Sequence, residues 1–248
     1  LDMRRFYLKY RKWQTVSAKL PWSHYALLLS VSNDFARGFY ERECIKQRWS
    51  FRELKRQINS MLFERIALSK NKKKVVELSK KGLIVKKESD IIKDPYILEF
   101  LGLHEEYSEK DFEQEIINNL QMFLLELGKG FTFVGRQFRI TLNNQHFYVD
   151  LVFYHKVLKC FVLIDLKIGK VTHADIGQMN LYLNYFKAEE NSQEDNKPIG
   201  IILSTDKDDI FVKYAIGGIS NKLFISKYRL YLPSEEELKK EVERLKCE

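Results

Sequence analysis

The sequence predicts a mixed α/β (α+β) protein, in which an N-terminal all-helical domain precedes an αβββαβ core. Two observations carry this prediction. Apolar residues recur at helical spacing through the first third of the chain, whereas three apolar runs follow one another directly between residues 131 and 168. Charged side chains stand inside two of those runs, and an unpaired charge inside a sheet is costly. These charges must therefore pair, reach water or bind a metal.

The composition bounds the class of protein. The 248 residues are 45% hydrophobic and 31% charged, which is enough for two modest globular domains. No apolar run approaches the ~20 residues of a membrane span, and no secretory signal is present, so we expect no membrane partner. Cys44, Cys160 and Cys247 are scattered and odd in number, which favours a reducing compartment. We therefore expect a cytoplasmic protein.

The net charge of +8 is distributed unevenly. Residues 1–95 contain 23 Lys and Arg against 10 Asp and Glu, whereas residues 96–248 contain 19 against 24. A polar segment ending at Pro95 lies at the change, so we expect a basic helical domain at 1–95 and a second domain at 96–248. The basic domain is either solvated or binds a polyanion such as nucleic acid, and charge alone leaves both open.

The first domain carries a clear helix-start signal. Ser50 and Glu53 form a capping box, so a helix is expected from Phe51 to about Ser69. Four cations lie outside its apolar stripe, where they are either solvated or placed along a phosphate backbone: Arg52, Lys55, Arg56 and Arg65. Further helices are expected at 3–12, 22–31, 35–47 and 75–81.

The second domain opens with a helix from Ser108, with Asp111 as the capping-box acid, to Gly128. Apolar runs at 131–142, 147–154 and 160–168 then predict a three-stranded antiparallel meander. Thr172 and Asp175 form a third capping box and begin the next helix. The remaining elements are expected as a strand at 199–203, a helix at 208–216, a strand at 223–228 and a charged helix from Ser234.

The acids of the meander suggest chemistry. Asp150 and Asp165 fall on consecutive strands, whose side chains can meet at ~5 Å across the ladder, and Lys167 shares a face with Asp165. Two carboxylates so close repel each other unless a cation lies between them. Mg²⁺ suits such a site because it takes oxygen ligands and binds phosphate oxygens. The alternative is a structural salt bridge in which Lys167 neutralises the pair.

Neighbouring helices supply further polar candidates. Glu113 lies at the edge of its helix's packed face, although an acid in a first helical turn also favours the helix dipole without any other role. Gln178 and Tyr182 share one face of the following helix. Three histidines flank the strands with no zinc-site spacing, and we expect surface roles for them: His146, His155 and His173.

The order Glu113, Asp150, Asp165-Leu-Lys167, Gln178 resembles the PD-(D/E)xK nuclease core of restriction endonucleases and Holliday junction resolvases. More closely, the segments LLELGKGFTFVGRQFRI, FYVDLVFYHKVLKCFVLIDLKIGK, GQMNLYLNYF and KPIGIIL resemble the YhcG-type PDDEXK nuclease domain-containing proteins. Segments MRRFYLKY, WSHYALLLSV and WSFRELKRQI are similar to the helical N-terminal domain of that family. The family begins further upstream than Leu1, so the resemblance implies a truncated N-terminus. This sequence departs from the wider nuclease signature at Val149, where a Pro is common, and at Asp165, where many relatives have Glu.

The resemblance implies a restriction-endonuclease-like fold and Mg²⁺-dependent phosphodiester hydrolysis, with Mn²⁺ as the alternative metal. The implied metal ligands are Asp150, Asp165, the Leu166 carbonyl and Glu113, with Lys167 orienting the water. Gln178 and Tyr182 would position the metal water, the lysine or the substrate. Arg136 and Gln137 point to opposite faces of their strand, and we select Arg136 as a phosphate contact. The other expected nucleic-acid contacts are Arg52, Lys55 and Arg56 of the basic domain.

We therefore predict an endodeoxyribonuclease acting on DNA, with branched or defence-related substrates. The expected partners are DNA, a second copy in a homodimer, and restriction or defence proteins. The alternative is a non-catalytic nucleic-acid-binding or complex-forming protein that retains the nuclease fold. The complete set of two acids and a lysine favours the enzyme, because a degenerate site would be expected to lose a member.

Overall fold

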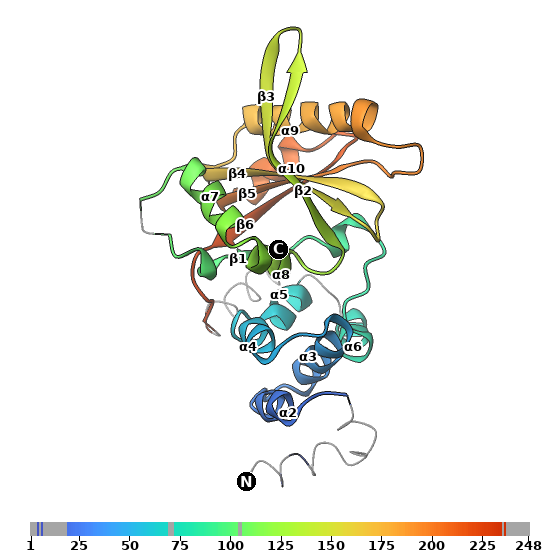
Figure 1. Cartoon of the computed structure of the whole chain (residues 1–248), viewed down its shortest axis with the longest axis vertical. Helices are drawn as coiled ribbons and strands as arrows, with labels where there is room; N and C mark the ends of the chain where they lie inside the picture. The colour runs from blue at the N-terminus through green and yellow to red at the C-terminus, as the bar shows by residue number, and fades with distance from the viewer. Residues whose placement is uncertain are drawn as a thin grey trace. The chain divides into compact units, whose positions relative to one another are not determined.

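The structure is a computed structural model, and it describes residues 4, 6, 19–68, 72–103, 106–234 and 236 (Figure 1). The chain separates into two compact units, of which one is Val85–Tyr231 and the other is formed by the residues on either side. The expected boundary at residue 95 thus lies ten residues inside the second unit, and the division at 95 stays a prediction. Most of the helix expected at 3–12, and the C-terminal helix expected from Ser234, lie outside the described residues.

The first unit is helical, as expected. Its helices are α2 (Trp22–Leu29), α3 (Asp34–Gln47), α4 (Phe51–Asn59), α5 (Leu62–Leu68) and α6 (Lys72–Lys81). The Ser50 side chain accepts a hydrogen bond from the backbone N–H of Glu53, and the Glu53 carboxylate accepts one from that of Ser50, which confirms the capping box. The single helix predicted at 51–69 is wrong in its length. Met61 has a φ of +51°, and this left-handed residue divides α4 from α5.

The basic side of these helices is smaller than the sequence suggested. Arg56 is only 8% exposed. Arg65 is buried as well, and its Nε donates a 2.8 Å hydrogen bond to the carbonyl of Ser60. Arg52 and Lys55 remain exposed on α4. Two of the four cations assigned to the solvent face are thus inside the unit, because a guanidinium can satisfy backbone carbonyls where the chain turns between helices.

The second unit follows the predicted order of elements. Its helices are α7 (Glu109–Asn118), α8 (Leu120–Leu127), α9 (His173–Tyr185) and α10 (Asp209–Ala215). Its strands are β1 (Tyr96–Ile97), β2 (Phe131–Leu142), β3 (Gln145–His155), β4 (Cys160–Lys170), β5 (Ile199–Asp206) and β6 (Lys222–Arg229). Short 3-10 turns at Glu88–Asp90 and Glu99–Leu101 and a π-helical turn at Phe186–Glu190 complete it. The helix predicted from Ser108 to Gly128 is divided at Asn119, so it forms α7 and α8.

The strands form one six-stranded sheet in the order β1-β6-β5-β4-β3-β2. β2, β3 and β4 pair antiparallel, which confirms the predicted meander. β5 pairs parallel to β4, and α9 makes the crossover between them. β1 and β6 extend the parallel part beyond β5. The observed architecture is therefore the predicted αβββαβ core with additional parallel strands.

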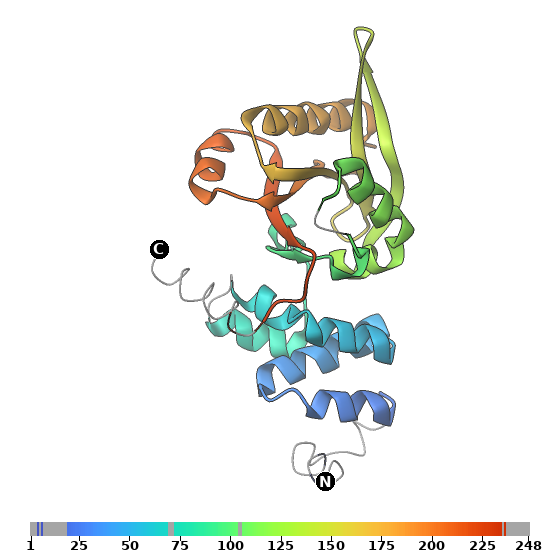
Figure 2. The same cartoon turned by 90° about the vertical axis from the view of Figure 1, so that its left-hand side faces the viewer.

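Helices cover both faces of the sheet, and each face buries its own cluster of apolar side chains (Figures 1 and 2). On one face, Phe112 of α7 and Phe123 of α8 pack with Phe153 and Leu166 of the sheet. On the other face, Met179 and Leu183 of α9 belong to the cluster that includes Leu163 and Ile202. Among the described residues, no helix is both long and apolar enough to span a bilayer.

One hairpin extends beyond this layered body. β3 pairs with β4 only from Leu151 onward, whereas its pairing with β2 continues to Gln145. We call the extended part, 138–142 of β2 with 145–149 of β3, the hairpin arm, and both views show it projecting past the rest of the unit (Figures 1 and 2). Asn143 and Asn144 close it with φ values of +46° and +63°, as a tight two-residue hairpin turn requires.

Candidate active site

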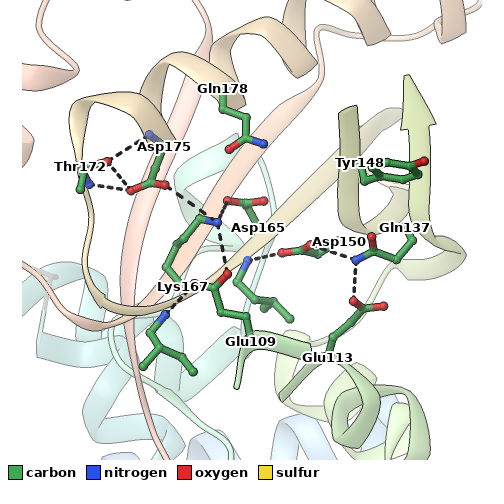
Figure 3. A network of polar contacts seen from close by, with 12 residues as sticks. Glu109, Glu113, Gln137, Tyr148, Asp150, Asp165, Lys167, Thr172, Asp175 and Gln178 are labelled. Carbon is green, nitrogen blue, oxygen red and sulfur yellow. Dashed lines mark hydrogen bonds and ion pairs between the residues drawn. The ribbon is translucent and has the colours of Figure 1, made fainter. Parts of the chain in front are cut away.

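The candidate site lies where β3 and β4 pass the first turns of α7 and α9 (Figure 3). Asp150 belongs to β3, and Asp165 and Lys167 belong to β4. Both helices begin at side-chain caps, because Ser108 accepts a hydrogen bond from the N–H of Asp111 and Thr172 accepts one from that of Asp175. The caps fix the first helical turns, and those turns carry acids that meet the lysine.

Asp150 is held by two donors. Its Oδ2 accepts a 2.8 Å hydrogen bond from the backbone N–H of Leu166, which fastens the carboxylate to β4. Its Oδ1 accepts a 3.1 Å hydrogen bond from the side-chain amide of Gln137. The same amide nitrogen donates to Glu113 Oε2 at 2.5 Å. Gln137 therefore bridges Asp150 and Glu113, and one carboxylate oxygen of each faces the other across it.

Gln137 occupies an irregular point of the sheet. It has a φ of +46° in the middle of β2, between Arg136, which pairs with Leu151, and Phe138, which pairs with Val149. On the partner strand, Val149 packs with the α9 cluster and Leu151 packs with the α7–α8 cluster, although strict alternation would place both on one face. An irregularity of this kind re-aims the side chains beside it, and such features are common next to active sites.

The Arg136 side chain, which we predicted to contact phosphate, contacts α7 in this structure. Its Nη1 donates a 2.9 Å hydrogen bond to the side-chain carbonyl of Gln114 on α7, and the residue is exposed. The structure brings Gln137, the neighbour that we did not select, to Asp150 and Glu113. The backbone at Gln137 explains the difference, since a left-handed residue in a strand cannot be placed by counting alternate positions. A phosphate contact by Arg136 stays a prediction.

Lys167 is surrounded by carboxylates. Its Nζ lies 3.3 Å from Asp165 Oδ2, 3.6 Å from Glu109 Oε2 and 3.9 Å from Asp175 Oδ1. Glu109 also accepts a 3.2 Å hydrogen bond from the backbone N–H of Ile168, so it holds the strand as well as the lysine. Figure 3 shows Glu109 and Asp175 approaching Lys167 from two different helices. The sequence predicts only a capping role for Asp175 and no role for Glu109.

The electrostatics follow from this crowding. Burial, and then the neighbouring charge of Asp150, raise the pKa of Asp165 to about 7. Burial also raises the pKa values of Asp150 and Glu113. Burial alone would lower the pKa of Lys167, but Asp165 and Glu109 outweigh it, so the pKa is raised. The lysine is therefore a fixed cation, and the acids around it are in excess.

The donor set fits a hard divalent cation. Asp165 is 3% exposed, and its Oδ2 accepts no hydrogen bond among the described residues, so the 3.3 Å ion pair with Lys167 is what compensates it. The described residues contain no group of three or more His, Cys, Asp or Glu side chains arranged to hold a metal. Mg²⁺ does not need one, because it commonly binds through one or two carboxylates and fills its octahedron with water and substrate oxygens. Asp150, Asp165 and the adjacent Leu166 carbonyl match that habit.

Gln178 and Tyr182 act on each other and on the backbone. The Gln178 amide donates to the Tyr182 hydroxyl, and that hydroxyl donates a 2.9 Å hydrogen bond to the carbonyl of Tyr148. Tyr182 is fully buried, so this chain of bonds fastens α9 to β3 two residues from Asp150. Burial raises the pKa of the Tyr182 phenol. Both residues thus brace the site in this structure, and their roles toward water or substrate stay predictions.

The three histidines make other contacts. His146 pairs with the Thr141 hydroxyl at 3.0 Å, and the ring of His173 lies against Phe211. His155 is buried, which differs from the surface position that we expected, because its two ring nitrogens meet the carbonyl of Lys129 and the N–H of Leu158. A buried imidazole with both nitrogens satisfied needs no metal to explain its position.

Comparison with known proteins follows the same outline. The family model described as the YhcG PDDEXK nuclease domain matches residues 89–243, and the one described as the DUF1016 N-terminal domain matches residues 1–65. The chain is 44% identical over 235 residues to "Putative nuclease YhcG" of Escherichia coli (strain K12), which covers 94% of this chain and 63% of that protein. The chain thus spans less than two thirds of this relative's length.

Two solved structures align with about half of the chain at low sequence identity. A repair endonuclease from Pyrococcus abyssi aligns with a TM-score of 0.35 and 20% identity, over 53% of this chain and 50% of that one. A structure of an EndoMS–dsDNA2 complex aligns with a TM-score of 0.35 and 16% identity, over 54% of this chain and 50% of that one.

Proposed function

This chain belongs to the YhcG PDDEXK nuclease domain family, and from that premise we propose that it is a Mg²⁺-dependent endodeoxyribonuclease that hydrolyses phosphodiester bonds of DNA. Membership places the chain among nucleases. The metal, the endonucleolytic mode and the DNA substrate are our proposals, as is every activity of the longer relative that the chain would share.

The observation that carries the proposal is the unbalanced charge at the site. Asp150 and Asp165 are both raised in pKa by burial, and the buried Oδ2 of Asp165 has the lysine ion pair and no hydrogen bond among the described residues. A divalent cation would relieve the repulsion between the two carboxylates and add a second positive charge beside Lys167. Asp150, Asp165 and the Leu166 carbonyl would hold it, and Glu113, which shares the Gln137 amide with Asp150, would act as an outer ligand.

The residues of the chain divide the remaining work. A bound Mg²⁺ supplies Lewis-acid activation of water and neutralises charge on the phosphate. Lys167 stays protonated among its carboxylates, so it donates to the attacking water or to a phosphate oxygen and does not serve as a base. Glu109 and Asp175 fix its position, and Tyr182 and Gln178 fix the backbone of β3.

The wider setting extends the proposal. The basic unit contributes DNA contacts through exposed residues such as Arg52 and Lys55, with Arg56 buried among the helices, and Arg136 contacts phosphate near the site. Breaking both strands of a duplex uses two such sites, so the working form is a homodimer. The protein acts in the cytoplasm, in restriction-linked or other defence, with Mn²⁺ able to replace Mg²⁺.

A Mg²⁺ titration tests the proposal. Labelled single-stranded, duplex and four-way-junction DNA are incubated with the parent chain and with the Asp165→Ala and Lys167→Ala variants. We expect cleavage by the parent alone, with each variant reduced by roughly 10³-fold or more, since several kcal/mol of charge stabilisation are removed. Binding by the variants, measured without metal, should be largely retained.

Other outcomes would favour the second candidate, a non-catalytic nucleic-acid-binding protein that keeps the fold. Equal binding by the parent and both variants, with no cleavage at any Mg²⁺ or Mn²⁺ concentration, would support it. Cleavage that persists in Asp165→Ala would remove that carboxylate from the mechanism.

A further inference from the structure

The hairpin arm has two different faces. Ile140 and Val149 are buried against the α9 side, together with the partly buried Phe138 and Phe147. Arg139 pairs with Tyr148 and Thr141 pairs with His146 across the ladder, so these four side chains share the opposite face. The 3.0 Å contact between the Thr141 hydroxyl and His146 confirms that this face is continuous across both strands. One face is thus anchored to the body, and the other is free for a partner.

The free face is basic and aromatic. No Asp or Glu occurs anywhere between Glu126 and Asp150, although residues 96–248 as a whole contain more acids than bases. Arg139 is exposed, and its side chain makes no hydrogen bond or ion pair with the described residues. Tyr148 is 45% exposed beside it in the ladder. A surface that lacks acids and presents a cation next to an aromatic ring suits a polyanion with flat bases.

The arm is also held rigidly at its base. The carbonyl of Tyr148 accepts the hydrogen bond from Tyr182, and Asp150 lies two residues further along the same strand. Figure 3 shows the Tyr148 ring above Gln137, next to the candidate metal ligands. At its other end the arm closes through the two-residue turn, with no flexible loop to order on binding. A nucleic-acid strand that left the site along β3 would therefore meet Tyr148 first and Arg139 beside it.

We propose that the outer face of the hairpin arm binds a single-stranded segment of nucleic acid that flanks the scissile phosphate. Tyr148 stacks on an unpaired base, and Arg139 binds a phosphate of the same strand. A base can stack on a side chain only when it has left its neighbour in the helix, which selects single-stranded or frayed DNA over continuous duplex. This inference rests on the proposed nuclease function, which makes Asp150 and Asp165 the place of cleavage. It adds that the substrate is single-stranded beside that place.

Binding is measured without metal, by fluorescence anisotropy with a labelled single-stranded oligonucleotide and with its duplex. We expect Tyr148→Ala to weaken single-strand binding about tenfold, whereas Tyr148→Phe keeps the ring and stays within about twofold of the parent. Arg139→Gln should weaken it by roughly fivefold and lower the slope of log affinity against log salt by about 0.7. The matched control is Lys156→Gln, which removes one exposed charge at the opposite end of β3 and should change affinity by less than about twofold.

Several results would overturn the inference. Parent-like single-strand binding by Tyr148→Ala and Arg139→Gln would remove the arm from the interface. An equal loss for Tyr148→Phe and Tyr148→Ala would exclude stacking, and an equal loss on the duplex would exclude single-strand selection. Unchanged thermal unfolding of each variant ensures that these readings report binding.

Cleavage by the same proteins in Mg²⁺ separates this inference from the proposed function. If the parent does not cleave but the arm variants still bind single strands more weakly, the nuclease proposal fails and the arm proposal stands. If the parent cleaves and depends on Asp165 while the arm variants bind like the parent, the arm proposal alone fails.

Discussion

Two buried groups of charges in the second unit are built in opposite ways. Lys93 Nζ lies 3.8 Å from Glu126 Oε1 and donates to the Glu126 carbonyl, and the same carboxylate accepts a 3.1 Å hydrogen bond from the N–H of Ile97. There a buried cation and a buried anion contact each other directly. At the candidate site one cation, Lys167, faces several carboxylates, and Asp165 keeps a buried oxygen with no hydrogen bond among the described residues.

The difference is the one expected between a structural ion pair and a functional site. A balanced pair with its remaining oxygens satisfied stabilises the fold once it is formed, and removing one member leaves an uncompensated charge. An excess of like charge destabilises the fold unless a ligand compensates it, and strongly perturbed carboxylates in such a place mark functional sites. The contrast can be tested by changing one acid of each kind.

The largest expected effect belongs to the balanced pair. Glu126→Gln should lower the free energy of unfolding by about 3–5 kcal/mol, because it removes the anion that lies 3.8 Å from the buried ammonium of Lys93. Urea unfolding of the parent and the variant measures this. A loss well under ~1 kcal/mol would mean that water reaches Lys93 and that the pair is not structural.

The next effect has the opposite sign. Asp165→Asn should raise the free energy of unfolding by about 2 kcal/mol in metal-free buffer at pH 8, because it removes a buried charge that repels Asp150. Mg²⁺ should stabilise the parent, since binding to the folded state shifts the unfolding equilibrium by mass action. It should not stabilise the Asp165→Asn variant, which lacks the metal-binding carboxylate. Thermal unfolding with and without Mg²⁺ measures both. A less stable Asp165→Asn would instead make Asp165 and Lys167 a structural pair like Lys93 and Glu126.

A smaller effect is expected where an acid only positions the lysine. Glu109→Gln should reduce Mg²⁺-dependent cleavage about tenfold, because the amide keeps a carbonyl oxygen for the Ile168 N–H but loses the ion pair with Lys167. Single-turnover cleavage gives the rate. The control is Glu115→Gln, which changes an acid of α7 whose carboxylate accepts hydrogen bonds from the side-chain amides of Asn118 and Asn119. Equal rates for Glu109→Gln and the parent would remove Glu109 from the support of the site.

The smallest effect concerns a satisfied neutral group. Burial lowers the pKa of His155, and its Nδ1 accepts the Leu158 N–H, so protonation breaks that hydrogen bond. Its contribution is fully present above the unfolded pKa of about 6.5 and is lost as pH falls through the lower folded value. We expect the stability difference between the parent and His155→Gln to fall by about 1 kcal/mol from pH 8 to pH 5. Urea unfolding across this range measures it, with His146→Gln as the exposed control, and a pH-independent difference would contradict the assignment.

Local chemistry made much of the fold predictable. The capping boxes at Ser50, Ser108 and Thr172 were expected at the residues where the structure has them, because each is formed within four consecutive residues. The antiparallel meander also followed from three adjacent apolar runs with a short asparagine turn. Asp150 and Asp165 could be placed on neighbouring strands for the same reason.

The sequence by itself determined the order of elements, the family and the central acids and lysine of the site, because these depend on neighbours along the chain or on motifs held in one segment. Only the tertiary structure decided which further side chains meet them. Glu109 and Asp175 reach Lys167 from two helices that are far apart in sequence, and Gln137 reaches Asp150 through a left-handed residue inside a strand. Neither contact leaves a periodic pattern in the sequence, since each depends on how packed helices and an irregular strand set the direction of a side chain.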